Sequence, residues 1–106
     1  MSRGLADLTP LVVEVSDTYA SRNAIGRGDD WYLLKLQEEV GELTAEYLKS
    51  TGRGRTKGAD APAIRRALED EAADVLATLL LFAHKNGIDL DAALERKWFQ
   101  YLGRGG

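Results

Sequence analysis

Acidic side chains are concentrated in two short windows of this sequence. Eight of the 17 Asp and Glu residues fall there. The first window holds Glu38, Glu39, Glu42 and Glu46, and the second holds Glu69, Asp70, Glu71 and Asp74. Clustered carboxylate oxygens favour a hard divalent cation, and Mg²⁺ prefers such oxygen ligands. Mg²⁺ is therefore the expected cofactor, with Mn²⁺ as the alternative.

Other metals fit the sequence less well. Calcium commonly uses a loop of alternating acidic residues around a central glycine, and the sequence has no such loop. Zinc prefers Cys and His ligands, whereas the chain has no cysteine and one histidine, His84. The absence of cysteine also excludes a disulfide framework and a thiol nucleophile.

Within each window, two carboxylates share one side of an apolar helical stripe. Glu39 and Glu42 form one i, i+3 pair, and Glu71 and Asp74 form the other. The stripes are Leu33, Leu36, Val40, Leu43 and Tyr47, and then Leu68, Val75, Leu79 and Phe82. If the stripes pack together, the two acidic pairs converge. The competing interpretation is that both windows are solvated helix faces.

Few local cations are available to offset this charge. Lys35 lies four residues before Glu39, and Lys49 lies three residues after Glu46. No lysine or arginine lies within helix spacing of Glu42 or Asp74. A converged cluster would therefore need a counter-charge from outside its own helices.

Four segments with helical periodicity must position these groups, and none alternates as a strand does. The first is expected from about Pro10 to Asn23, with Thr9 as its N-cap and Pro10 as its first residue. The others are expected from Asp29 or Asp30 to about Ser50, from after Asp60 to Asn86-Gly87, and from Asp89 or Asp91 to Gly103. The sequence predicts an all-α fold, arranged as a four-helix bundle.

Length and composition bound the protein class. The chain has 106 residues, 44% of them hydrophobic, and a net charge of −3. These values predict a single soluble domain spanning residues 1–106. The sequence contains neither an apolar run long enough to span a membrane nor a secretory leader, so a cytoplasmic protein without a membrane partner is expected.

A glycine-rich basic loop, at about residues 51–60, joins the second and third segments. It contains Arg53, Arg55 and Lys57 but lacks the spacing of a nucleotide-binding P-loop. One interpretation is a flexible, solvated linker, and the other is a flap that binds phosphate. A nucleic acid polymer is not an expected partner, because the remaining surface is acidic.

The acidic motifs resemble a known enzyme family. Glu38-Glu39-Val40-Gly41-Glu42 followed by Glu71-Ala72-Ala73-Asp74 is similar to the E-E-x-x-E … E-x-x-D signature of the MazG-like nucleoside triphosphate pyrophosphohydrolases. The stretch from about Trp31 to Arg104 carries the resemblance. It implies a MazG-like all-α bundle, a magnesium site, and homodimers or homotetramers.

By matching positions, the resemblance implies that Glu39, Glu42, Glu71 and Asp74 are metal ligands. Glu38 would be a further ligand or would orient water, and either Glu38 or Glu39 could act as the catalytic base. Lys97 matches a position where the family often has a phosphate-contacting lysine. Trp31 could stack on a nucleobase or anchor the packing of its helix.

The implied reaction is the hydrolysis of a nucleoside triphosphate to the monophosphate and pyrophosphate. The residues fit direct attack by water, because the sequence offers no serine or cysteine nucleophile paired with a base. The expected role is removal of unwanted nucleotides from the cellular pool. Two alternatives remain: a phosphoribosyl-ATP pyrophosphohydrolase, and a non-catalytic helical interaction module.

A self-associating chain is also expected from the apolar pattern. On the third segment, Leu76, Leu80 and Leu81 lie outside the main stripe. A helix that is apolar nearly all round is usually buried on more than one side. The sequence therefore predicts at least a dimer.

Overall fold

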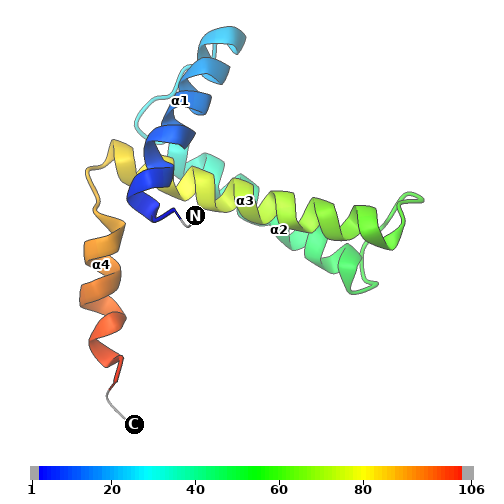
Figure 1. Cartoon of the computed structure of the whole chain (residues 1–106). Helices are drawn as coiled ribbons and strands as arrows, with labels where there is room; N and C mark the ends of the chain where they lie inside the picture. Colours follow the sequence, from blue (N-terminus) through cyan, green and yellow to red (C-terminus); the bar gives the residue numbers. More distant parts are fainter. Residues whose placement is uncertain (1–2, 104–106) are drawn as a thin grey trace. The chain divides into compact units, whose positions relative to one another are not determined.

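The computed structural model describes residues 3–103, and within this range every regular element is a helix (Figure 1). The order is α1 (Leu5–Asn23), α2 (Trp31–Ser50), α3 (Ala61–Lys85), α4 (Leu90–Lys97) and the short 3₁₀ helix η1 (Phe99–Tyr101). The all-α prediction with four helices is confirmed. The chain divides into two compact units. One holds residues 26–79, and the other joins the chain up to residue 25 with the chain from residue 80 onward.

Helix α1 begins one turn earlier than the sequence predicts. The prediction of Thr9 as N-cap was wrong, because the Thr9 hydroxyl donates to the Leu5 carbonyl at 2.8 Å inside the helix. The actual cap is Gly4, whose backbone N–H donates to the Asp7 carboxylate at 2.9 Å. Pro10 therefore lies inside α1. At this sixth position of the helix, the missing N–H leaves the Ala6 carbonyl without its usual intrahelical donor.

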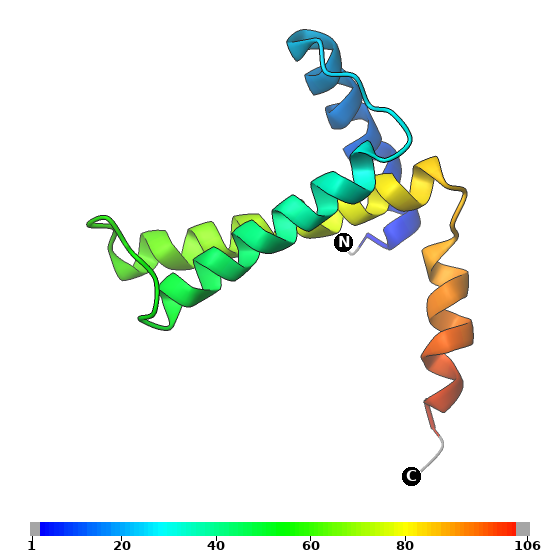
Figure 2. The ribbon, with the colours of Figure 1, turned by 180° about the vertical axis from the view of Figure 1, so that it is seen from behind.

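Helices α2 and α3 begin and end as predicted. Asp60 precedes α3, and its carboxylate accepts a hydrogen bond from the backbone N–H of Ala63 at 3.0 Å. Past the end of α3, Gly87 has a φ of 65°, a left-handed conformation that favours glycine. In Figures 1 and 2, α2 and the first part of α3 run side by side in opposite directions as a helical hairpin.

Helix α4 is capped by Asp89 rather than Asp91. The Asp89 carboxylate accepts from the backbone N–H of Ala92 at 3.0 Å. The predicted extension to Gly103 was too long. After Lys97 the hydrogen bonds change to the tighter i to i+3 pattern, as in Tyr101 N–H to the Trp98 carbonyl at 3.2 Å.

Few side chains are fully removed from solvent. The buried apolar residues are Ala20, Tyr32, Leu80 and Ala83. Leu80 lies outside the main apolar stripe predicted for its helix, yet it is the least exposed of these residues at 2%. Two polar residues, Glu39 and Thr78, are buried to the same degree as this core, each at 7% exposure. A carboxylate in that position needs a physical explanation.

None of the helices in the described part of the chain combines the length and the apolar character needed to cross a membrane.

Candidate metal centre

Three carboxylates from the two helices of the hairpin converge. Glu39 and Glu42 come from α2, and Glu71 comes from α3. One oxygen from each of them lies within 4.8 Å of the other two. Glu39 is buried, Glu71 is half-buried and Glu42 is exposed, so the group runs from the interior to the surface. An ion at this site could reach both protein ligands and water.

Two oxygens in this trio have no hydrogen-bond donor. They are Oε2 of Glu39 and Oε2 of Glu71, and both are removed from solvent. An unsatisfied buried polar atom costs about 1–3 kcal/mol, and a charged one costs more. Two such atoms from facing helices therefore indicate that something positive, either a proton or a cation, belongs between them.

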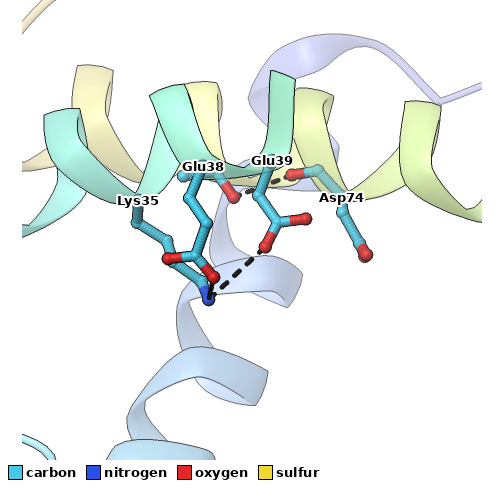
Figure 3. A network of polar contacts seen from close by, with 5 residues as sticks. Lys35, Glu38, Glu39 and Asp74 are labelled. Atoms are coloured by element: carbon cyan, nitrogen blue, oxygen red, sulfur yellow. Dashed lines mark hydrogen bonds and ion pairs between the residues drawn. The ribbon is translucent and has the colours of Figure 1, made fainter. Parts of the chain in front are cut away.

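The other oxygen of Glu39 is paired. Lys35 Nζ lies 3.4 Å from Glu39 Oε1 and 3.2 Å from Glu38 Oε1 (Figure 3). Burial lowers the pKa of Lys35, but its hydrogen bonds and charge interactions with Glu38 and Glu39 raise it above the usual value. Lys35 therefore stays charged. It neutralises one side of Glu39 and leaves the side toward Glu71 unpaired.

The crowding of negative charge changes how Glu71 titrates. Burial, the hydrogen-bonding neighbour Glu39, and the charges of Glu42, Glu39 and Asp74 raise the pKa of Glu71 to about 7. Near neutral pH, Glu71 thus exchanges between a protonated form, which can donate to Glu39, and a charged form, which repels it. A divalent cation would compete directly with that proton.

Asp74 lies at the edge of the cluster and not among the three converging oxygens. It is exposed on α3, and its side chain projects to the same side as Glu39 (Figure 3). Desolvation and the charges of Glu39 and Asp70 raise the pKa of Asp74, while the charge of Lys35 lowers it. Sequence spacing could not reveal this charge interaction between Lys35 and Asp74, because the two residues lie on different helices.

Glu38 lies outside the trio, at the water-facing side of Lys35. Its side chain is 56% exposed and pairs with that lysine. The i, i+3 spacing of Lys35 and Glu38 is the sequence signal from which this ion pair can be found.

The two predicted substrate-binding residues have different surroundings. Trp31 is the first residue of α2 and is half-buried, with its ring edge-on to Tyr32 at a centroid distance of 5.0 Å. This contact favours the anchoring role for Trp31. Lys97 is the exposed last residue of α4 and belongs to the other compact unit.

Comparisons with known proteins add no relative that could assign a role to these residues. No family model matches the chain, and neither a curated protein nor a solved structure matches it. The case for a function therefore depends on the chemistry of the cluster and on the sequence motif.

Proposed function

We propose that the protein is a magnesium-dependent pyrophosphohydrolase of nucleoside triphosphates, of the MazG-like type. The observation that carries the proposal is a pair of buried, donor-less oxygens, Oε2 of Glu39 and Oε2 of Glu71, within the carboxylate trio that these residues form with Glu42. Solvated helix faces would not bury these atoms. Their positions also coincide with the acidic motif of that family.

Glu39, Glu42 and Glu71 would hold the cation, and Asp74 would join them at the exposed edge. An all-oxygen donor set suits Mg²⁺, or Mn²⁺ as its substitute, and the exposure of Glu42 leaves room for water ligands. When bound, the ion would supply charge neutralisation of the phosphates and acidification of a water molecule.

The residues of the chain then have separate tasks. Lys35 holds Glu39 and Glu38 in place through its two ion pairs. Glu38, on the solvent side, is positioned to orient an attacking water or accept its proton. The attack breaks a phosphoanhydride bond and releases a nucleoside monophosphate and pyrophosphate. Lys97 would contact phosphate. Trp31 would either anchor the packing of its helix or stack on a nucleobase.

We further propose that the chain assembles as a homodimer or homotetramer and acts on free cytoplasmic nucleotides, removing those unwanted in the pool. Assembly is supported by Leu33, Val40 and Tyr47 of α2, since these residues are 45–52% exposed in the chain. A membrane or a nucleic acid polymer is not a proposed partner.

The first test is binding of the cation. A bound ion stabilises the folded state by mass action, so Mg²⁺ should raise the melting temperature, and a non-hydrolysable nucleotide analogue should raise it further. A non-catalytic helical module that uses the acidic windows for solubility predicts no such response. Identical melts with Mg²⁺ and with matched ionic strength from NaCl would reject the metal site.

The second test is turnover. We expect pyrophosphate release from one or more nucleoside triphosphates, and Glu39→Gln or Asp74→Asn should reduce the rate by about a hundredfold or more while the helical circular dichroism is retained. Glu14→Gln, at an exposed position of α1, is the charge-matched control and should retain full activity. Full activity in purified Glu39→Gln would refute the site.

The substrate panel also separates the two enzyme alternatives. It should contain ATP, the four deoxynucleoside triphosphates, deoxy-UTP and phosphoribosyl-ATP. Turnover of phosphoribosyl-ATP alone would show that the protein is a phosphoribosyl-ATP pyrophosphohydrolase.

A further inference from the structure

The loop between α2 and α3 is a concentrated positive patch. We define the basic loop as residues 51–60, with the cations Arg53, Arg55 and Lys57. The single carboxylate in this range, Asp60, is engaged as the N-cap of α3. All three cations are exposed, and neither Arg55 nor Lys57 has an ion-pair partner in the described part of the chain.

The positive charge comes from side chains and not from the helix ends. The C-terminal end of α2 and the N-terminal end of α3 meet at this loop. Their macrodipoles carry about half a charge of opposite sign each, so they largely offset one another. The three side-chain cations within five residues, Arg53, Arg55 and Lys57, therefore dominate the local potential.

One of these cations is held in a fixed orientation. The Arg53 Nε–H donates to the Thr51 hydroxyl at 3.0 Å, and its guanidinium carbon lies 5.9 Å from the centroid of the Tyr47 ring. The backbone N–H of Arg53 also donates to the Leu48 carbonyl at 2.7 Å. Arg53 is therefore preorganised, which reduces the entropy lost when it binds an anion.

The backbone of the basic loop is also constrained. A Cβ at Gly54 would lie 3.0 Å from the backbone nitrogen of Lys49, so a larger residue would need the loop or the end of α2 to shift by a few tenths of an ångström. Lys57 adopts a left-handed φ of 52°, which is costly for a residue with a side chain. Such local strain is frequently found at binding sites.

The basic loop and the acidic cluster belong to one hairpin, at separate positions along it. Glu42 lies eight residues before the end of α2, which corresponds to about 12 Å of helix axis. A phosphorylated ligand bound through a cation at the cluster could therefore present a second phosphate toward the loop. Arginine favours phosphate oxygens because its planar fork can donate two hydrogen bonds at once.

We propose that the basic loop is a phosphate-binding site that selects substrates carrying a second phosphate group, separate from the anhydride cleaved at the acidic cluster. The selectivity part of this inference rests on the proposed function, whereas phosphate binding by the loop does not. Arg55 and Lys57 supply most of the accessible charge, and Arg53 provides a fixed donor.

Phosphate binding is tested by NMR titration of the ¹⁵N-labelled protein with inorganic pyrophosphate, without divalent cations. We expect saturable shifts at the backbone amides of residues 52–58 and at Arg53 Nε–H. The double variant Arg55→Gln/Lys57→Gln should weaken binding about tenfold, and added salt should weaken it too. The control Arg22→Gln/Arg65→Gln, with the same charge change at two exposed positions, should bind as the wild type does.

An equal loss of pyrophosphate affinity in both double variants would show that only the net charge of the protein matters, and it would overturn the site. Binding of a DNA duplex that is lost in Arg55→Gln/Lys57→Gln, together with no response to pyrophosphate, would assign the loop to nucleic acid and also overturn the inference.

Selectivity is tested with a nucleoside triphosphate and the same compound carrying one more phosphate on its ribose. Arg55→Gln/Lys57→Gln should raise the KM of the second compound about tenfold, with kcat unchanged, and leave the first unaffected. Equal KM values for the second compound in wild type and variant would overturn the selectivity. If the loop binds pyrophosphate but neither compound is hydrolysed, the proposed function fails and the phosphate site stands.

Discussion

Glu39 is the residue on which the functional interpretation depends. A carboxylate that is 7% exposed needs compensation for its lost hydration, and Lys35 provides it at only one of the two oxygens. The second oxygen of Glu39 has no donor, and neither has the buried Oε2 of Glu71 in the same trio. At the scale of single residues, the cluster is therefore incomplete unless a proton or a cation occupies it.

The titration of Glu71 gives the residue-scale prediction. Burial and neighbouring charges disfavour its carboxylate form and raise its pKa from the ordinary 4.5 to about 7 in the folded protein. A raised pKa means that Glu71 contributes most to stability below pH 4.5, and that this contribution is lost as the pH rises to about 7. In Glu71→Gln the amide can still donate to Glu39 and does not titrate, so this variant should keep that stability as the pH rises.

The measurement is the melting temperature of both proteins between about pH 5 and pH 8 in metal-free buffer. The wild type should lose stability relative to Glu71→Gln as the pH increases, and Mg²⁺ should reduce the difference in slope. Parallel pH profiles for the two proteins would show that Glu71 is an ordinary exposed carboxylate.

At the scale of elements, local caps decide where each helix begins. Asp89 and Asp91 both precede or begin α4, yet only Asp89 accepts a hydrogen bond from a backbone N–H of the first turn. Similarly, Asp60 caps α3 through its side chain, whereas Asp30 before α2 makes no such bond. For α4 the sequence rules included the correct cap, Asp89, between two candidates, whereas for α1 they pointed to Thr9 and the cap is Gly4.

The element-scale prediction concerns α4. Asp89→Ala should lower the free energy of unfolding by about 1 kcal/mol, since a lost N-cap typically costs that amount. Asp91→Ala removes the same charge at the neighbouring exposed position without removing a cap bond and should cost less. Urea unfolding followed by circular dichroism measures both, and equal midpoints for the two variants would contradict the assigned cap.

At the scale of the whole molecule, the main feature is the amount of exposed apolar surface. Among the described residues no large side chain is below 2% exposure, while thirteen large apolar ones exceed 40%. Leu33, Val40 and Tyr47 of α2 are three of these, spaced by seven residues along one line of the helix. Such a line usually contacts another helix, and a second copy of the chain is our proposed partner.

Sedimentation velocity tests this prediction at micromolar concentration. The wild type should sediment as a dimer or tetramer, and Leu33→Lys/Val40→Lys should shift it toward monomer, because two charges would have to be buried in the interface. Val15→Lys, at a 70% exposed position of α1, is the control for adding charge at an exposed apolar site. A wild-type monomer would refute the assembly.

Local sequence patterns by themselves determined the number and type of the four α-helices, the bounds of α2 and α3, and the pairs Lys35–Glu39 and Lys49–Glu46. These features depend on a period of 3.6 residues and on short-range hydrogen bonds, which can be read from spacing. The early start of α1 could not be read from these rules, because Thr9 and Pro10 form a typical helix-start pair although both lie inside the helix.

Only the tertiary structure decided which carboxylates meet. Spacing grouped Glu39 with Glu42 and Glu71 with Asp74, but packing brings Glu42 into the trio and leaves Asp74 at its edge. Sequence spacing also could not show that Oε2 of Glu39 and Oε2 of Glu71 are buried from water without a hydrogen-bond donor. The physical reason is that desolvation and repulsion depend on distances between helices, and these are set by how α2 and α3 pack rather than by the order of residues within either one.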